Sequence, residues 1–178
     1  MTKEEARIFQ KKRILEIENR LEKEKSIRKN LLSFINANHS IIGYRADKWE
    51  VNLDVIWESS NLEKEFYFPK VVSKEKREME FIHPLSWING SYGLLEPVGV
   101  KTILPEKVDI ILLPALGFND QGYRLGRGAG YYDRILTRVE PKKIVGIGFS
   151  ELFSIDFPST DYDIRVGALV TDLAVLFF

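Results

Sequence analysis

"VDIILLPAL" (residues 108–116) is the stretch of sequence that decides the fold, because its apolar run is continuous rather than alternating. Such a run is typical of a strand that is covered on both faces. "KIVGIGF" (143–149) is a second run of this kind, and "GYYDRILTRV" (130–139) between the two has apolar residues at helical spacing. Strands that alternate with helices in this way predict an α/β fold with a mostly parallel sheet.

The flanking sequence extends this pattern in both directions. Residues 3–35 predict two charged amphipathic helices, with Ser26 as the cap of the second. The stretch 51–60 predicts a helix with Val51, Val55 and the neighbouring Ile56 on its apolar side. Further strands are predicted at 40–45, 65–72, 78–85 and 168–178, and loops at 73–78 and 87–99.

The length and composition are those of an ordinary globular protein. The chain has 178 residues, of which 44% are hydrophobic and 29% are charged. We therefore expect a single three-layer α/β domain over residues 1–178, with a mostly parallel central sheet flanked by helices and with N-terminal helices.

The charge and cysteine content exclude several classes of function. Lys plus Arg and Asp plus Glu number 26 each, so the formal net charge is zero. Proteins that bind nucleic acid through its phosphates are usually basic, and we expect no nucleic-acid partner. The absence of cysteine excludes disulfides, thiolate zinc sites and cysteine nucleophiles. No stretch approaches the ~20 apolar residues of a membrane span or resembles a signal peptide, so we expect a cytoplasmic protein with no membrane partner.

The segment "RLGRGAGYYDR" (124–134) combines glycines, arginines, two tyrosines and one aspartate directly after the strongest strand. Glycines let backbone N–H groups approach a phosphate, and the start of the following helix favours negative charge. Arg124 and Arg127 add guanidinium groups that match phosphate oxygens. Asp133 is suited to Mg²⁺ held together with substrate phosphates, and the tyrosines to stacking on a flat ring. The segment therefore indicates a phosphate-binding site.

Two known phosphate motifs are absent, and a second interpretation stays open. The chain has no GxxxxGK[ST], and the glycines at 126, 128 and 130 do not form GxGxxG. The alternative is a glycine-rich turn whose arginines are solvated and whose tyrosines fill the core. Trp87, in the predicted loop, is expected in the core or over a ligand ring.

A longer stretch carries a family resemblance. "LLPALGFNDQGYRLGRGAGYYDRIL" (112–136) resembles P-x-x-x-F-D-x-x-G-x-R-L-G-x-G-x-G-Y-Y-D, the motif of the 5-formyltetrahydrofolate cyclo-ligase family, also called methenyltetrahydrofolate synthetases. Fainter similarities include an N-terminal K-x-x-x-R at Lys3 and Arg7, "EVN" at 50–52 and "YDIRVGALVTD" at 162–172. The resemblance implies a single α/β domain that converts 5-formyltetrahydrofolate and ATP to 5,10-methenyltetrahydrofolate, ADP and phosphate.

The same resemblance implies a role for each matching residue. Arg127 and Tyr132 would be catalytic. Folate would be bound by Glu50, Arg45, Arg127 and Tyr131, and Mg²⁺ would be held by Asp133 and Asp163. ATP would be bound by Lys3, Arg7, Arg124, Leu125, Gly126, Arg127, Gly128, Ala129, Gly130, Tyr131 and Tyr132. The partners would thus be folate and ATP, and the protein a monomer or weak homodimer.

Three positions depart from the family pattern. Asn119 stands where the family has aspartate, Ala129 where glycine or lysine is common, and Arg45 where an apolar residue is expected. They motivate a rival hypothesis, a non-catalytic relative that binds nucleotide and acts as a binding or regulatory module. A structural protein with neither ligand is a third.

Overall fold

The structure, a computed structural model, describes residues 1–59 and 63–178. Its helices are α1 (Lys3–Leu15), α2 (Arg20–Ala37), α3 (Asp54–Glu58) and α4 (Tyr131–Ile135). Its strands are β1 (Ser40–Ile42), β2 (Glu65–Ser73), β3 (Glu78–Ile82), β4 (Ser86–Asn89), β5 (Leu95–Val98), β6 (Thr102–Ile103), β7 (Ile110–Pro114), β8 (Gly117–Phe118), β9 (Arg124–Leu125), β10 (Ile144–Ile147), β11 (Ala168–Val170) and β12 (Val175–Phe177).

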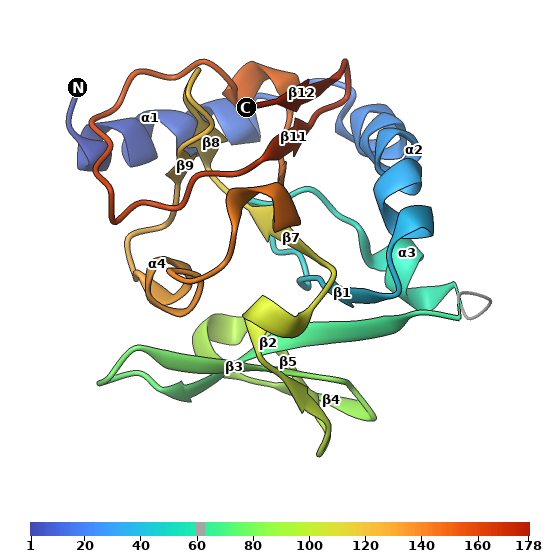
Figure 1. The fold of residues 1–178 in the computed structure, drawn as a ribbon. Coiled ribbons are helices and arrows are strands. Elements are labelled where there is room, and N and C mark those ends of the chain that lie inside the picture. The colour runs from blue at the N-terminus through green and yellow to red at the C-terminus, as the bar shows by residue number, and fades with distance from the viewer. Residues whose placement is uncertain (60–62) are drawn as a thin grey trace.

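Eight of these strands form one sheet, in the order β12–β11–β10–β7–β1–β2–β3–β6 (Figure 1). The four pairs from β11 to β2 are parallel, and the outer pairs β11–β12, β2–β3 and β3–β6 are antiparallel. The predicted α/β fold with a mostly parallel central sheet is confirmed.

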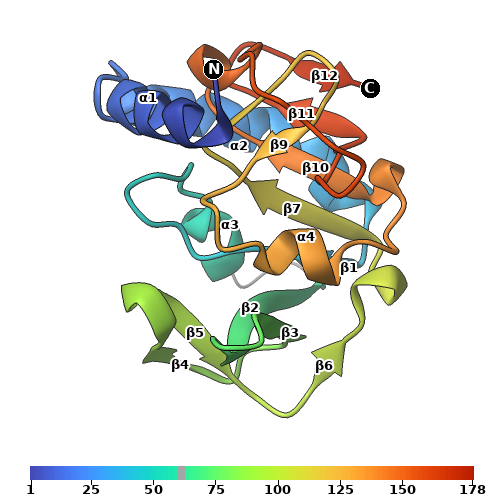
Figure 2. The same ribbon diagram turned by 90° about the vertical axis from the view of Figure 1, so that its left-hand side faces the viewer.

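Strand β7 lies inside the sheet and is covered on both faces. Ile110 and Leu112 belong to the apolar cluster that also contains buried residues of α1, α2 and α3. Ile111 and Leu113 belong to the opposite cluster, which contains residues of α4 and of the segment after it. Figure 2 shows β7 between the two layers. Both alternating sets of side chains are therefore buried, which is why the run is apolar throughout.

The two N-terminal helices are confirmed, but the predicted cap at Ser26 is wrong. Helix α2 begins at Arg20, directly after Asn19, whose φ of 52° breaks the chain away from α1. Ser26 lies in the second turn of α2, where its hydroxyl donates to the Glu22 carbonyl at 3.1 Å. A serine hydroxyl inside a helix can donate its hydrogen bond to a backbone carbonyl of the preceding turn, so the presence of Ser26 did not mark the start of the helix.

The helix predicted at 51–60 is shorter than expected. It covers only Asp54–Glu58, and the predicted position 60 lies outside the described residues. Ile56 is buried as predicted, whereas Val55 is 62% exposed, so the assignment of Val55 to the apolar side is wrong. In this short helix the core contacts come from Ile56 and from the partly buried Trp57.

The loop predicted at 87–99 is wrong. The segment forms the hairpin of β4 and β5, in which Trp87 pairs with Pro97 and Ile88 with Glu96. Gly90, Ser91 and Gly93 lie in the turn between the strands, which the Gly90 N–H closes by donating to the Leu94 carbonyl at 2.8 Å. Turn residues inside the stretch hid the two short strands beside them.

The helix predicted at 130–139 is also shorter. Helix α4 spans Tyr131–Ile135, and Leu136 and Val139 follow it as buried residues of a turn. Pro141 comes two residues later and has no N–H with which to continue a helix. No helix in the described part of the chain has the length and apolar character needed to cross a membrane.

Candidate active site

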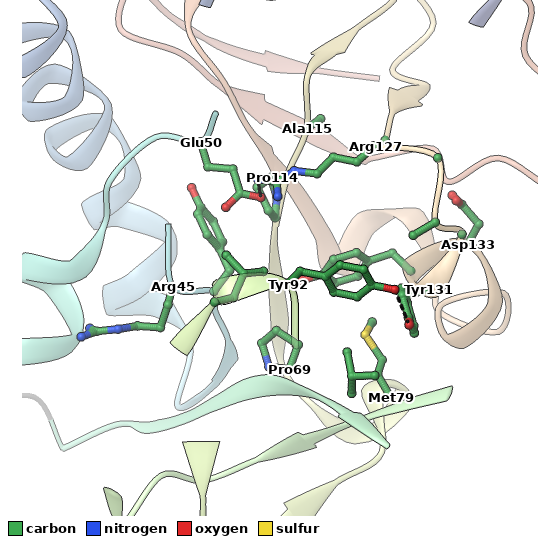
Figure 3. A pocket seen from close by; sticks show the side chains of 18 of the residues that line it. Arg45, Glu50, Pro69, Met79, Tyr92, Pro114, Ala115, Arg127, Tyr131 and Asp133 are labelled. Carbon is green, nitrogen blue, oxygen red and sulfur yellow. Dashed lines mark hydrogen bonds and ion pairs between the residues drawn. The ribbon is translucent and has the colours of Figure 1, made fainter. Parts of the chain in front are cut away.

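A cavity of about 330 Å³ opens at the carboxyl ends of β1 and β7, which lie side by side. The helix after β1, α3, packs on one face of the sheet, and the helix after β7, α4, packs on the other. Ligands of open α/β sheets bind at such a switch point. Figure 3 shows side chains of the lining, which come from both strand ends, β2, β3, the β4–β5 hairpin and the segment 124–133.

A second cavity of about 70 Å³ shares a wall with the first. Lys3 and Arg7 of α1 and Asp163 of the C-terminal segment line it. Five residues line both cavities, namely Arg124, Gly126, Gly128, Gly130 and Asp133. The glycine-rich segment is therefore the wall between a larger, partly apolar cavity and a smaller, charged one.

Glycine is needed at two positions of this wall. Gly128 has a φ of 99° and Gly130 has a φ of 74°, in the left-handed region that side chains disfavour. The Arg7 guanidinium lies against this bend, and its Nε donates to the Gly126 carbonyl at 2.9 Å. Helix α1 therefore holds the glycine-rich segment in place through the residue that the sequence predicted for ATP.

Arg124 is buried inside the wall rather than solvated. Its Nε donates to the Pro114 carbonyl at 2.8 Å, and its guanidinium carbon lies 5.0 Å from the centre of the Tyr132 ring. An Arg124 guanidinium nitrogen lies 3.9 Å from an Asp133 carboxylate oxygen. Arg124 thus fixes the wall from within and brings positive charge to the edge of both cavities.

Arg127 reaches across the larger cavity to the segment after β1. One guanidinium nitrogen lies 2.5 Å from an Asp47 oxygen and 2.8 Å from a Glu50 oxygen. The structure therefore brings together Glu50 and Arg127, which the sequence predicted separately. Asp47, which the sequence analysis did not select, completes this three-residue cluster.

Glu50 has an unusual acidity in this cluster. Its side chain is only 12% exposed, and burial raises the pKa of the Glu50 carboxyl to about 7. The Arg127 charge lowers this pKa and the Asp47 carboxylate raises it, so burial outweighs the ion pair. A carboxyl group that titrates near neutrality inside a ligand-sized cavity is a feature of functional sites.

The two tyrosines of the segment have different surroundings. Burial, with the nearby Glu50 charge, raises the pKa of the Tyr132 hydroxyl, which therefore stays protonated. The Tyr131 hydroxyl lies 3.2 Å from the Tyr92 hydroxyl of the β4–β5 turn, and the rings meet edge to face. Both rings also pack against the core. The alternative of a solvated turn is thus right about the tyrosines and about Arg134, and wrong about Arg124 and Arg127.

A brace from α2 holds the segment that carries Glu50. Arg20 donates to the Lys48 carbonyl at 2.8 Å and to the Glu50 carbonyl at 2.6 Å. The buried Glu24 carboxylate accepts from Arg20 and from the Asn52 N–H, each at 3.1 Å. The backbone on both sides of the Glu50 side chain is thereby fixed to a long helix.

The two aspartates predicted for metal both line the smaller cavity. Asp163 accepts from the Lys3 ammonium at 2.5 Å and from the Thr160 N–H at 2.7 Å. Burial would raise the pKa of Asp163, but these hydrogen bonds outweigh burial and lower the pKa. Within the described residues, no three metal-ligating side chains cluster. Mg²⁺ takes one or two carboxylates together with substrate phosphates, so this pair fits such an ion.

Arg45 lines the cavity but does not turn its charge toward it. Its guanidinium lies 3.5 Å from Asp54 and 3.2 Å from Glu58, and it stacks 4.8 Å from the Trp87 ring centre. In Figure 3 its side chain runs away from the other labelled side chains. The Trp87 ring packs against the Phe68 ring, with 4.9 Å between the ring centres. Trp87 does not line the cavity, whereas Tyr92 of the same hairpin does.

Sequence reasoning missed the residues that depend on tertiary contacts. Asp47 and Tyr92 line or close the larger cavity, and Arg20 and Glu24 brace it. The only local signal was for Arg20 and Glu24, whose four-residue spacing is typical of a helical ion pair. The same spacing is common on helix surfaces, so it did not point to the site.

Comparisons with known proteins identify the family of the chain. The model of the 5-formyltetrahydrofolate cyclo-ligase family matches residues 2–172. A mitochondrial 5-formyltetrahydrofolate cyclo-ligase of Arabidopsis thaliana is 32% identical over 139 residues, which are 66% of this chain and 50% of the plant protein. The match to the Escherichia coli K12 enzyme is 27% identical over 126 residues, 67% of this chain and 68% of that protein.

Solved structures resemble the whole chain. The 5,10-methenyltetrahydrofolate synthetase of Aquifex aeolicus superposes with a TM-score of 0.83 at 31% identity, covering 99% of this chain and 93% of that chain. The synthetase of Mycoplasma pneumoniae superposes with a TM-score of 0.77 at 26% identity, covering 97% and 99%. The sequence match, in contrast, spans half the length of the Arabidopsis relative.

Proposed function

The chain belongs to the 5-formyltetrahydrofolate cyclo-ligase family, and we propose that it converts 5-formyltetrahydrofolate and ATP to 5,10-methenyltetrahydrofolate, ADP and phosphate. The observation that carries this proposal is the pair of cavities with one shared wall. A reaction that moves a phosphoryl group from a nucleotide to a second substrate needs two sites that meet at the transferred group. The segment 124–133 is where the two cavities meet.

The smaller cavity is assigned to the ATP phosphates. Lys3 and Arg7 bring two positive charges from adjacent turns of α1, and Arg124 lines the same cavity. Asp133 and Asp163 would hold Mg²⁺ there together with phosphate oxygens. When bound, the ion would neutralise charge on the transferring phosphoryl group. In this structure the Lys3 ammonium donates hydrogen bonds to both oxygens of the Asp163 carboxylate. Lys3 would therefore turn from this carboxylate to a phosphate as the nucleotide binds.

The larger cavity is assigned to the folate. Its walls include the apolar side chains of Pro69, Met79 and Leu95, and its volume is in the range of ligand sites. The Glu50 carboxylate lies at one side of this cavity (Figure 3). An ionised carboxylate only accepts hydrogen bonds, which suits the amino and ring N–H groups of a pterin.

The chemistry requires positioning and charge neutralisation more than covalent catalysis. The formyl oxygen on N5 attacks the γ-phosphorus of ATP, and ADP leaves with the electrons of the broken P–O bond. N10 then attacks the formyl carbon, loses its proton, and the phosphate departs with the former formyl oxygen. Arg127 belongs to the segment that separates the two cavities, and its guanidinium would stabilise the transferring phosphoryl group. The protonated Tyr132 hydroxyl would orient the same phosphoryl group.

The first test is turnover of the purified protein. With 5-formyltetrahydrofolate and MgATP, we expect ultraviolet absorbance of the methenyl product and an equal amount of ADP. Arg127→Ala is expected to lower kcat by about 10²–10³-fold, as removal of a preorganised donor does. Arg134→Ala removes an exposed arginine of the following helix α4 and is expected to leave turnover unchanged.

Two results would contradict the assignment. Calorimetric binding of MgATP without turnover of the wild type would favour the non-catalytic relative instead. Equal turnover in Arg127→Ala and Arg134→Ala would remove Arg127 from the reaction.

A further inference from the structure

The mouth of the larger cavity is bordered by the turn between β2 and β3. The Lys74 ammonium lies 5.0 Å from the centre of the Tyr92 ring, which in turn contacts Tyr131. An Arg77 guanidinium nitrogen lies 3.8 Å from the position that a Cβ on Gly130 would take. We call Lys74, Arg77, Tyr92 and Tyr131 the mouth cluster. Two cations thus flank a pair of aromatic rings.

The cations of the mouth differ from those inside the cavity. Arg127 is paired with Asp47 and Glu50, and Arg45 is paired with Asp54 and Glu58. Among the described residues, by contrast, Lys74 and Arg77 form no ion pair. The inner cations are therefore neutralised by the protein itself, and the charge of the mouth is left for a ligand.

The backbone of the mouth is held in a conformation that side chains disfavour. Arg77 has a φ of 54° and Tyr92 has a φ of 60°, whereas glycine is the usual residue in this region. A non-glycine residue there carries a cost in stability, and such residues gather at ligand sites. Arg77 therefore stands at a turn where glycine would fit with less strain.

We propose that Lys74 and Arg77 bind the carboxylates at the glutamate end of the folate. This inference rests on the proposed function. Glu50 lines the cavity and Asp47 lies beside it on the same Arg127 guanidinium; both carboxylates repel other carboxylates and accept from N–H donors, so the pterin enters first. The opposite, anionic end of the substrate then leaves past the contacting rings of Tyr92 and Tyr131, on the side of Lys74 and Arg77. A tail with more glutamates places more carboxylates beside the two cations and binds more tightly.

The test is calorimetric binding, without ATP, of 5-formyltetrahydrofolate that carries one or three glutamates. We expect the wild type to bind the triglutamate about fivefold more tightly, the size of effect that two exposed ion pairs supply. The double variant Lys74→Ala/Arg77→Gly is expected to bind both folates equally. Lys76→Ala removes one positive charge from the same turn, as each single change of the double variant does, and is expected to keep the preference.

Arg77→Gly alone separates the site from the fold. Glycine relieves the φ of 54°, so its melting temperature is expected to equal or exceed that of the wild type. Its preference for the triglutamate is nevertheless expected to fall, and raising the salt concentration is expected to weaken the wild-type preference.

The possible results distinguish failure of this inference from failure of the proposed function. Normal turnover with equal affinity of the wild type for both folates overturns this inference and leaves the proposed function intact. A preference that survives in the double variant also overturns it. If Arg77→Gly weakens binding of ATP and leaves the tail preference unchanged, the mouth serves the nucleotide. Failure of the wild type to bind any folate overturns both.

Discussion

At the scale of single residues, Glu50 shows how burial turns an ordinary side chain into a group that titrates near neutrality. The carboxyl lies beside Arg127, yet burial outweighs this cation and brings the pKa to about 7. Desolvation penalises the charged form more than one ion pair favours it. Within the proposed function, the ionised form is the one that accepts hydrogen bonds from the pterin.

This acidity predicts a pH dependence of folate binding. Because the pKa of Glu50 in the free protein is raised, the carboxyl is largely protonated below about pH 7 and must lose a proton to bind. The folate Kd is therefore expected to fall as the pH rises from 6 to 8, by up to about tenfold per pH unit below the pKa. The charged groups that face Glu50 are Arg127, Asp47 and Arg124.

Glu50→Gln supplies the comparison, measured by calorimetry across the same range. We expect weaker binding that no longer changes with pH, and an unchanged Kd for ATP. A pH dependence that persists in Glu50→Gln would assign the titration to another group.

At the scale of elements, the loop after β1 owes its shape to α2. Arg20 and Glu24 hold the backbone of residues 48–52 through four hydrogen bonds. Three of these bonds are made to backbone groups and one joins the two side chains. The loop that presents Asp47 and Glu50 is therefore anchored to α2.

Loss of this brace is expected to change folate binding and leave ATP binding intact. Arg20→Ala leaves the buried Glu24 without its cation and frees two carbonyls, which costs about 1–3 kcal/mol of stability. We expect the KM for folate to rise several-fold while the KM for ATP stays constant. Lys25→Ala, at an exposed position of the same helix, is the control. An equal rise in both KM values would argue that Arg20 only supports the fold.

At the scale of the whole molecule, the smaller cavity joins the two ends of the chain. Lys3 in the first helix contacts Asp163 in the segment before β11, 160 residues away. Between them stands the glycine-rich segment, which Arg7 holds through Gly126. Nucleotide bound in this cavity would therefore tie together three distant parts of the chain.

Binding of MgATP is accordingly expected to stabilise the entire protein. At ~100 times its Kd, a ligand adds about 2.7 kcal/mol, which for a chain of this size raises the Tm by several degrees. Lys3→Ala is expected to reduce this shift because a phosphate contact is lost. Lys12→Ala, an exposed lysine of the same helix, is expected to keep it. Equal shifts in the two variants would place the phosphates elsewhere.

The sequence by itself determined the features that depend on neighbouring residues. The continuous apolar run at 108–116 indicated a strand covered on both faces, and the spacing of Ile27, Leu31 and Ile35 indicated a helix. The segment 124–134 marked the site, because glycine conformation and charge density are local properties. The family resemblance supplied Glu50, Lys3 and Asp163, which no local pattern distinguishes from surface residues.

Only the tertiary structure decided which of these residues meet. Arg127 and Asp47 are 80 residues apart, and they pair because β1 and β7 are neighbours in the sheet. The outward turn of Arg45 and the approach of Arg77 to Gly130 depend in the same way on packing between distant segments. A periodic pattern of apolar residues shows which face of a helix or strand is buried. The order of the strands in the sheet decides which elements pack against that face. The site is therefore a product of the order of the strands.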